Sequence, residues 1–240
     1  MSDTVVFIPA WNEEGNLPAV LDELHEQLPE ADVLVVDDGS TDGTADVARE
    51  HGAQVLSFGE NRGLRAGIAA GYSWALEHGY AFCGRVDADG QHPAPELKRL
   101  LAMVQADECD VAVGSRFVSG DGYAAYRYRP SGPRRFGTAL LRRAMAVVLR
   151  QPFGDATSGL YAVNGKALPL LAKPYTTEAP EVEALIRVVD AGLRLREVPV
   201  NMAERASGQS KLRGSKAVKV VLTVVATLVA AKIVQAKRKG

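Results

Sequence analysis

The chain has 240 residues, 47% of them hydrophobic and 24% charged, and its 28 basic and 29 acidic side chains give a net charge of -1. That size and composition are typical of a globular protein with one sizeable core. Two cysteines exclude a disulfide framework, so we expect buried free thiols and a reducing, cytoplasmic location. The first residues enter a predicted strand without a basic and apolar leader, so we expect no export signal.

Short apolar runs alternate with helical patterns along the first half of the chain. The spacing of apolar residues predicts strands at 4–8, 32–36, 53–57, 81–86 and 110–113, and helices at 13–28, 65–77 and 95–105. Residues 40–42 can cap a further helix that runs to residue 50. This alternation predicts an α/β fold, with a mostly parallel sheet covered by helices on both faces. In such sheets, ligands bind beyond the carboxyl ends of the strands.

Polar clusters follow three of the predicted strands, at residues 11–14, 37–40 and 87–89. In the third cluster, Asp87 and Asp89 are separated by one residue, and alternate side chains of an extended chain point the same way. Both carboxylates can therefore reach one divalent cation. Mg²⁺ or Mn²⁺ held by one or two carboxylates keeps positions open for phosphate oxygens. The pattern thus favours an open site for a diphosphate over a closed structural site.

The second cluster lies in VVDDGSTDGT at 35–44, where a buried strand leads into two acids, a glycine turn and a helix start. Glycine permits close approach of the backbone, and a helix N-terminus presents free N–H groups. A capped helix entry explains residues 40–44 alone. It does not explain the adjacent Asp37 and Asp38, which would repel each other without a cation or hydrogen-bond donors. An acid here can accept from a nucleobase N–H or a ribose hydroxyl.

Several motifs, in this order and spacing, resemble those of the family 2 glycosyltransferases of GT-A fold. They are IPAWNEE at 8–14, VVDDGSTDGT at 35–44, NRG at 61–63 and DADGQH at 87–92. Later motifs resemble the dolichyl-phosphate mannose synthase-like branch, whose members glycosylate polyprenyl phosphates: GSRF at 114–117, DATSGLY at 155–161 and ERASGQSK at 204–211. The resemblance covers residues 4–212 and is more specific for the fold and for sugar transfer than for the sugar or the acceptor.

The resemblance implies a role for each matching donor-side residue. The nucleoside pocket would be lined by Pro9, Trp11, Glu13, Asp38 and Gly63, with Trp11 standing where the family usually has Tyr. Asp87 would lie near the sugar diphosphate, and Asp89, with Asp87 and Gln91, would bind Mg²⁺ or Mn²⁺.

The resemblance also implies phosphate and acceptor contacts. Arg116 would approach the diphosphate or an acceptor phosphate, and Ser158 and Gly159 would shape the acceptor side. Arg205 and Lys211 would clamp phosphates. Surface charge is the alternative for the three basic residues.

The acceptor decides whether a general base is needed. A phosphate monoester is already anionic near neutral pH, because its second pKa is about 6. A hydroxyl acceptor needs a base. The candidates are Glu178, Glu181 and Glu183, of which we favour Glu181, although glutamates are also common at a helix N-terminus. His92 is expected to cap the turn before Pro93 rather than act as a base.

Charge is distributed unevenly along the chain. Residues 205–240 carry nine basic and no acidic side chains, whereas the first 204 carry 19 basic and 29 acidic ones; residues 122–154 hold seven arginines and no acid. These regions suggest an anionic partner, the alternative being a solvated basic face. The uncharged run at 220–231 would form a helix of about 18 Å, short of the roughly 30 Å of a bilayer core.

We therefore expect a GT-A catalytic domain at residues 1–205 and a basic loop with an amphipathic, apolar helix at 206–240. That helix would lie at the cytoplasmic membrane face, or else pack on the domain or on a second subunit. We expect a peripheral membrane protein with no nucleic-acid partner. A homo-oligomer is left open.

The expected function is metal-dependent, inverting transfer of a sugar from a GDP- or UDP-linked donor to a polyprenyl phosphate, with mannose preferred. One alternative transfers to a soluble sugar, glycan or natural-product hydroxyl with Glu181 as the base. Another is a non-catalytic nucleotide-sugar binding protein. A sugar nucleotidyltransferase is disfavoured, because residues 9–12 are not the glycine- and arginine-rich loop it requires.

Overall fold

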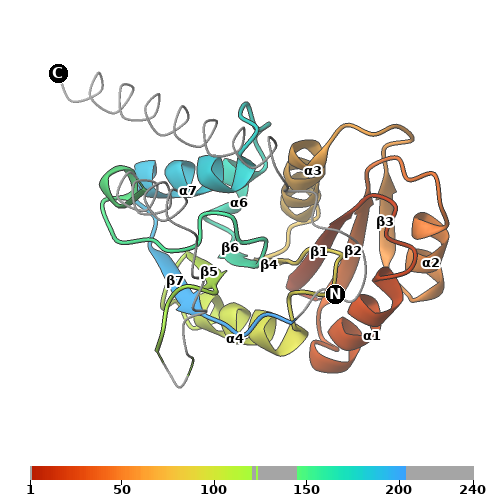
Figure 1. The fold of residues 1–240 in the computed structure, drawn as a ribbon, viewed down its shortest axis with the longest axis horizontal. Helices are drawn as coiled ribbons and strands as arrows, with labels where there is room; N and C mark the ends of the chain where they lie inside the picture. Colours follow the sequence, from red (N-terminus) through yellow and green to blue (C-terminus); the bar gives the residue numbers. More distant parts are fainter. Residues whose placement is uncertain (1, 121–122, 124–144, 204–240) are drawn as a thin grey trace, which may run out of the picture.

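The computed structural model describes residues 2–120, 123 and 145–203, which form a seven-stranded sheet with helices on both faces (Figure 1). The α/β fold expected from the sequence is therefore confirmed. In chain order the elements are β1 (Thr4–Ala10), α1 (Leu17–Gln27), β2 (Asp32–Asp37), α2 (Thr44–Glu50), β3 (Gln54–Ser57), α3 (Leu64–Glu77), β4 (Phe82–Arg85), α4 (Ala94–Gln105), β5 (Val111–Ser115), β6 (Tyr161–Asn164), α6 (Leu168–Leu171), α7 (Pro180–Asp190) and β7 (Leu195–Pro199).

The strand order brings the ends of three strands to one edge. The order is β3-β2-β1-β4-β6-β5-β7, and every neighbouring pair is parallel except the two that involve β6. β1 lies between β2 and β4 and pairs in parallel with both. The carboxyl ends of these three strands therefore meet at the same edge, where the three polar clusters begin.

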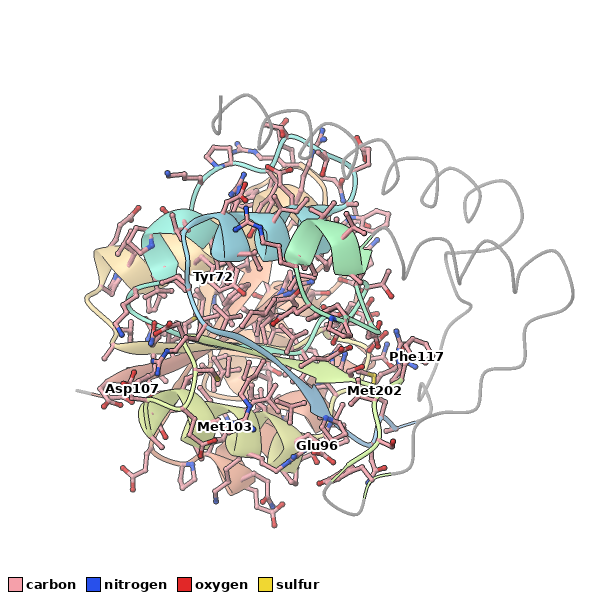
Figure 2. The ribbon with its side chains drawn as sticks, turned by 90° about the vertical axis from the view of Figure 1, so that its left-hand side faces the viewer. Tyr72, Glu96, Met103, Asp107, Phe117 and Met202 are labelled. Carbon is pink, nitrogen blue, oxygen red and sulfur yellow. The ribbon has the colours of Figure 1, made fainter. Side chains whose placement is uncertain are left out.

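Alternate strand residues bury their side chains on opposite faces of the sheet, as the pleat requires. In β1, Val5 and Phe7 join the apolar cluster under α3, α6 and α7. Val6 and Ile8 join the cluster packed against α1, α2 and α4. Figure 2 shows the two layers, with Tyr72 of α3 on one side of the sheet and Met103 of α4 on the other. Both faces are thus covered, which explains why every residue of the central strand β1 is buried.

One helix begins later than its sequence pattern predicts. α1 begins at Leu17 rather than at residue 13, because the N–H groups of Asn16 and Leu17 both bond to the Glu13 carbonyl in a turn. α2 begins at Thr44, after the predicted cap residues 40–42. The residues before α2 are instead bonded to the loop after β1: the Asn12 N–H donates to the Ser40 hydroxyl. The loop after β1 and the loop before α2 are thereby joined at the edge of the sheet where the polar clusters lie, which we call the polar rim.

Other expectations concern the cysteines and the C-terminal segment. Cys83 and Cys109 are both buried free thiols, as predicted. Among the described residues, no helix is long and apolar enough to cross a membrane. Arg205, Lys211 and the predicted helix within 206–240 lie outside the described residues.

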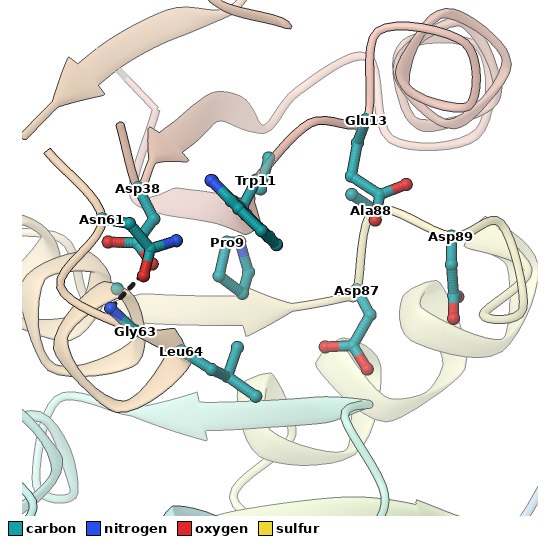
Figure 3. Close-up of a pocket in the computed structure, with 12 residues that line it drawn as sticks. Pro9, Trp11, Glu13, Asp38, Asn61, Gly63, Leu64, Asp87, Ala88 and Asp89 are labelled. Carbon is teal, nitrogen blue, oxygen red and sulfur yellow. Dashed lines mark hydrogen bonds between the residues drawn. The ribbon is translucent and has the colours of Figure 1, made fainter. Parts of the chain in front are cut away.

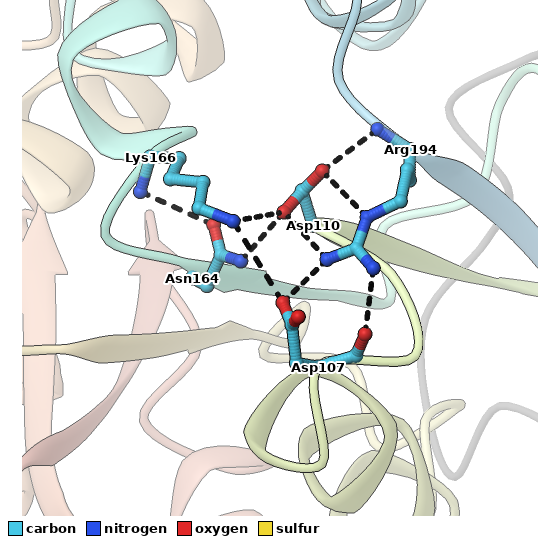
Figure 4. Close-up of polar contacts among 5 residues, drawn as sticks. All are labelled: Asp107, Asp110, Asn164, Lys166 and Arg194. Atoms are coloured by element: carbon cyan, nitrogen blue, oxygen red, sulfur yellow. Dashed lines mark hydrogen bonds and ion pairs between the residues drawn. The ribbon is translucent and has the colours of Figure 1, made fainter.

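A charged cluster closes the edge of the sheet opposite the polar rim (Figure 4). The Asp110 carboxylate, directly before β5, accepts hydrogen bonds from Arg194, from Asn164 Nδ2 at 2.9 Å and from Lys166 Nζ at 3.2 Å. Arg194 also pairs with Asp107. The hydrogen bonds from Arg194 hold the pKa of Asp110 well below its ordinary value, against the opposing effect of burial. Asp110 thus joins the segments before β5, after β6 and before β7.

We expect Asp110→Ala to lower the free energy of unfolding by about 2–3 kcal/mol, because several donors lose a charged acceptor. A carboxylate with a depressed folded-state pKa stabilises the protein above its unfolded-state pKa of about 3.9, and this contribution is lost as the pH falls. Urea unfolding at pH 7 and pH 3 measures both effects. The difference between wild type and variant should be large at pH 7 and smaller at pH 3; an equal difference at both would contradict the charge-based account.

Candidate functional site

A pocket of about 380 Å³ opens at the edge where β1, β2 and β4 end (Figure 3). It brings together seven residues that the sequence analysis proposed, from all three polar clusters and the segment before α3: Pro9, Trp11, Glu13, Asp38, Gly63, Asp87 and Asp89. Five further residues complete its lining: Ala10, Asn61, Leu64, Gly67 and Ala88.

One end of the pocket is apolar. Trp11 and Leu64 are large apolar side chains, yet they are 41% and 50% exposed. In Figure 3 both face the pocket, with Pro9 between them. Exposed apolar surface beside polar groups is typical of a ligand site, and an aromatic ring offers a stacking surface to a planar group. Leu64 was not predicted, although it directly follows the NRG motif.

The two adjacent acids at the end of β2 are both satisfied by hydrogen-bond donors. Asp37 accepts from the Ser40 N–H at 2.9 Å and from the Ser57 hydroxyl at 2.7 Å. Burial raises the pKa of Asp37, but these hydrogen bonds outweigh it and hold the pKa below its ordinary value. The carboxylate of Asp38 accepts from the N–H groups of Arg62 and Gly63, at 2.6 and 2.8 Å. Asp38 therefore fixes the segment at 61–63 that lines the pocket.

Gly39 allows the turn after β2 to pass directly against that segment. Its φ is +67°, and a Cβ at this position would lie 2.2 Å from the backbone carbon of Glu60. Only glycine fits such a contact in the left-handed region. The glycine turn predicted from the sequence therefore places Asp38 beside the segment that it holds.

Asp87 and Asp89 follow β4 and point to the same side of the chain, away from Ala88 (Figure 3). This is the arrangement expected from the alternation of side chains. Asp89 Oδ1 accepts from the Gln91 N–H at 3.1 Å, and the Gln91 carbonyl accepts from the Ala203 N–H at 3.0 Å. The chain that leads to residue 204 therefore returns to this edge of the pocket.

His92 belongs to the turn rather than to the pocket. Its Nδ1 accepts from the Asp87 N–H at 3.1 Å, and its side chain is buried. Burial lowers the pKa of His92, although Asp87 and Asp89 oppose that effect. An imidazole nitrogen that accepts a backbone N–H carries no proton, so His92 is neutral. Its hydrogen bond with the Asp87 N–H caps the turn before Pro93, as the sequence predicts.

The acids of the pocket fit an open metal site rather than a closed one. Among the described residues, no group of three or more His, Cys, Asp or Glu is placed to hold a metal ion. Asp87 and Asp89 instead offer hard oxygen ligands from one short stretch, next to free pocket volume. Mg²⁺ typically binds with one or two carboxylates and completes its shell with phosphate oxygens and water.

Arg116 is held at the edge of the site by a buried acid. Its Nε and one terminal nitrogen bond to the two carboxylate oxygens of Asp155, at 2.8 and 3.1 Å. Asp155 is buried, and Glu197 of β7 accepts the Asp155 N–H at 2.8 Å. Burial lowers the pKa of Arg116, but Asp155, Asp87 and Asp89 together raise it above its ordinary value. The guanidinium is therefore fixed within electrostatic reach of both pocket acids.

Asp155 and Glu197 were not predicted from the sequence as part of the site. Asp155 opens the DATSGLY motif, which was the available signal. Ser158, in the same motif, is buried, and its hydroxyl accepts the Leu160 N–H at 3.2 Å. Ser158 therefore shapes its own loop from inside.

Gly159 packs directly on Asp87. A Cβ at position 159 would lie 2.1 Å from Asp87 Oδ2, far inside any allowed contact. The carboxylate thus occupies the space that a side chain would fill. The loop after Asp155 thereby limits where the carboxylate of Asp87 can lie.

Arg85 was also missed, although it lies two residues before Asp87. Its side chain is 2% exposed, and one terminal nitrogen lies 3.3 Å from Asp87 Oδ1 and 3.1 Å from Glu181 Oε1. Burial lowers the pKa of Arg85, but Asp87 and Glu181 outweigh it, so the guanidinium stays charged. An arginine at the end of an apolar strand was the available signal.

The three glutamates near the start of α7 have different surroundings. Glu178 is exposed and pairs with Arg65 at 3.1 Å. Glu183 accepts from the backbone at 176–177 and from Arg187 at 2.6 Å. Glu181 lies beside Arg85, and burial raises its pKa although Arg85 opposes that effect. Of the three, Glu181 is connected through Arg85 to the pocket.

Comparison with known proteins agrees with the fold and the motifs. Residues 5–158 match the family described as "Glycosyl transferase family 2". "Polyprenol monophosphomannose synthase" of Mycolicibacterium smegmatis is 34% identical over 221 residues, covering 88% of this chain and 82% of that protein. "Undecaprenyl-phosphate mannosyltransferase" of Micrococcus luteus is 35% identical over 220 residues, covering 88% of this chain and 87% of that protein.

Similar solved structures include two synthases. The structure of glucosyl-3-phosphoglycerate synthase from Mycobacterium tuberculosis, in complex with Mn²⁺, UDP and glucosyl-3-phosphoglycerate, has a TM-score of 0.67 at 22% identity and covers 95% of this chain and 79% of its own. Mannosyl-3-phosphoglycerate synthase from Rubrobacter xylanophilus has a TM-score of 0.63 at 20% identity, with coverage of 98% and 75%. At these identities the likeness shows the fold alone.

Proposed function

The chain belongs to glycosyl transferase family 2 and is a glycosyltransferase, and on that premise we propose that it moves a sugar from a nucleotide-sugar donor to a polyprenyl phosphate. The observation that carries this proposal is the pocket, in which two exposed apolar side chains, Trp11 and Leu64, and two acids, Asp87 and Asp89, line one cavity. Two relatives named as polyprenol and undecaprenyl phosphate mannosyltransferases support the lipid phosphate as acceptor and mannose as the sugar.

In this proposal, different residues of the pocket contact different parts of the donor. The nucleobase lies between Trp11 and Leu64, and Asp38 holds the segment at 61–63 against the nucleoside. Pro9, Glu13 and Gly63 complete that end of the pocket. Mg²⁺ or Mn²⁺, held by Asp89 with Asp87 and Gln91, would neutralise the diphosphate leaving group.

Transfer then proceeds in one displacement. An oxygen of the acceptor phosphate forms a bond to the sugar C1 while the bond from C1 to the diphosphate oxygen breaks, on opposite faces of the ring, so the configuration inverts. No proton has to be removed, because the acceptor is already anionic. Arg116, fixed by Asp155, stabilises phosphate charge at the edge of the pocket. Ser158 and Gly159 shape the loop on the acceptor side.

The C-terminal segment would serve the acceptor. Arg205 and Lys211 contact phosphates in this proposal, which the return of the chain at Ala203 to Gln91 supports. The basic and apolar residues of 206–240 would bind the cytoplasmic face of the membrane, where the polyprenyl chain resides. The enzyme is then a peripheral membrane protein.

A panel of donors and acceptors tests the proposal. GDP-mannose, UDP-glucose and UDP-N-acetylglucosamine are each supplied with Mn²⁺, with a short polyprenyl phosphate in detergent, with soluble sugars, or with no acceptor. We expect nucleoside diphosphate release that depends on the polyprenyl phosphate, and NMR of the product should show an inverted anomeric centre. Release that depends only on soluble sugars would overturn the lipid acceptor, and a retained anomer would overturn the single displacement.

A second candidate transfers the sugar to a soluble hydroxyl, with Glu181 as the base. The pKa of Glu181, raised by its partial burial although Arg85 opposes that effect, favours it. In that case Glu181→Gln would abolish turnover on a hydroxyl acceptor with nucleoside diphosphate binding intact. For a phosphate acceptor, loss of a proton acceptor at this position has no direct effect on bond formation.

We expect Asp38→Asn to weaken nucleoside diphosphate binding by about tenfold, since an amide offers one acceptor oxygen where two N–H groups need one each. The segment at 61–63 then loses its fixed position in the pocket. Titration calorimetry with GDP and UDP in Mn²⁺ measures the change. Asp22→Asn, on an exposed aspartate that pairs with His51, is the matched control and should bind like wild type. Unchanged affinity in Asp38→Asn would remove Asp38 from the binding site.

A further inference from the structure

Arg85 is buried next to Asp87, which lines the pocket. Burying the charge of its guanidinium lowers the stability of the fold. Its side chain is 2% exposed, and among the described residues its Nε is one of the few buried side-chain atoms that form no hydrogen bond. A buried ion pair is often no more stabilising than apolar residues of similar volume, and an unsatisfied buried donor costs about 1–3 kcal/mol. An apolar residue at the end of β4 would serve the core better, so stability alone does not explain this arginine.

The neighbours of Arg85 direct its charge at one pocket acid. Arg85 and Asp87 are two residues apart in extended chain and point the same way. The guanidinium reaches Asp87 Oδ1 at 3.3 Å, and Gly159 closes the other side of that carboxylate. From α7, Glu181 holds the same terminal nitrogen at 3.1 Å. The ring of Tyr161, the partner of Arg85 in β6, lies 5.8 Å from the guanidinium carbon.

We propose that Arg85 is a positioning residue that, held by Glu181, fixes the Asp87 carboxylate toward the sugar half of the donor. Glu181 then acts as a counter-ion that sets where the guanidinium lies. This division leaves Asp89, which is bonded to the turn at Gln91 rather than to Arg85, as the principal metal ligand. The inference rests on the proposed function, because it assumes a nucleotide-sugar donor.

If Arg85 positions Asp87, its loss should affect binding of a nucleotide sugar and of a nucleoside diphosphate differently. A carboxylate fixed toward the transferred sugar accepts hydrogen bonds from the hydroxyls of that sugar, which is absent from a nucleoside diphosphate. Loss of its orientation should therefore weaken binding of the nucleotide sugar more than binding of the nucleoside diphosphate. A role of Arg85 in folding alone would not change the ratio of the two dissociation constants.

The test uses the double variant Arg85→Met/Glu181→Gln, which removes both charges and so leaves no uncompensated ion in the core. Calorimetry without acceptor, in Mn²⁺, compares a nucleotide sugar with its nucleoside diphosphate. We expect the ratio of dissociation constants to change by about tenfold against the nucleotide sugar. An unchanged ratio, or equal weakening of both ligands, would overturn the assignment.

Arg187→Met is the matched control. Arg187 is also a largely buried arginine, 18% exposed, but it bonds to the carbonyls of Leu170, Lys173 and Pro174, away from the pocket. Its loss should lower the unfolding temperature and leave the ratio of dissociation constants as in wild type. A changed ratio in Arg187→Met would show that the effect is a general response to lost packing.

A measurement without donor keeps the inference separate from the proposed function. Crystal structures of wild type and of the double variant should differ in the orientation of Asp87, with Asp89 in place. An Asp87 carboxylate that stays where Arg85 held it would overturn the inference. If wild type binds no nucleotide sugar, the proposed donor is wrong, and the crystal structures still decide whether Arg85 positions Asp87.

Discussion

Replacing Asp89 with Asn should lower the rate of sugar transfer by about 10³-fold while leaving the fold intact. The amide oxygen of Asn can still accept the Gln91 N–H, so the turn after β4 keeps its hydrogen bond. In the proposed function, the variant loses a negative charge that would bind the metal. The diphosphate leaving group then departs without full neutralisation, and each 1.36 kcal/mol of lost transition-state stabilisation costs about tenfold in rate.

Two measurements accompany that rate. Thermal unfolding of Asp89→Asn should match wild type, and the affinity for Mn²⁺ in the presence of nucleoside diphosphate should fall. Asp46→Asn, on an exposed acid whose side chain is 81% accessible, is the matched control and should transfer at the wild-type rate. Wild-type turnover by Asp89→Asn would remove Asp89 from the metal site.

A methyl group added at position 159 should lower the rate of transfer more than any other change except Asp89→Asn. We expect Gly159→Ala to lower the turnover number by about 100-fold, because a displacement of about 1 Å in a catalytic group can cost that much. The added Cβ would lie 2.1 Å from Asp87 Oδ2, so the carboxylate or the loop must move. Steady-state kinetics with the preferred donor measures the loss, and the crystal structure of the variant shows which group has moved.

Gly15→Ala is the matched control for that substitution. A Cβ at position 15 would meet no atom within 4 Å, and Gly15 lies on the turn before α1. The same chemical change should therefore leave turnover unaltered there. If Gly159→Ala also turned over like wild type, the position of Asp87 would not matter for transfer.

The parallel half of the fold could be predicted because its signals are local. Each strand from β1 to β5 is an apolar run, and each is separated from the next by a helical pattern. β6 and β7 were not predicted. β6 has four residues and begins within the DATSGLY motif, and β7 has charged residues between its apolar ones. Their places depend on pairing with β4 and β5, which no local pattern records.

The pocket could be predicted where its residues follow strands. Parallel pairing of β1 with β2 and β4 brings residues 9–13, 38 and 87–89 to one edge, which the order of motifs already indicated. Arg85 and Asp155 were not predicted; they do not line the pocket but contact other charged residues of the site. Arg85 meets Glu181 across 96 positions of sequence, and Asp155 meets Arg116 across 39. Only the folded chain shows that these charges are neighbours.

The fate of a labelled sugar shows whether a lipid phosphate is the acceptor. Purified full-length chain is incubated with Mn²⁺, a short polyprenyl phosphate in detergent and GDP-mannose labelled in the mannose, and the mixture is extracted with organic solvent. We expect label to enter the organic phase, EDTA to abolish this transfer, and Asp89→Asn to show almost none. Label that stays in the aqueous phase with GDP-mannose and with every UDP-sugar tried, while nucleoside diphosphate is released to a soluble acceptor, would contradict a lipid phosphate as the acceptor.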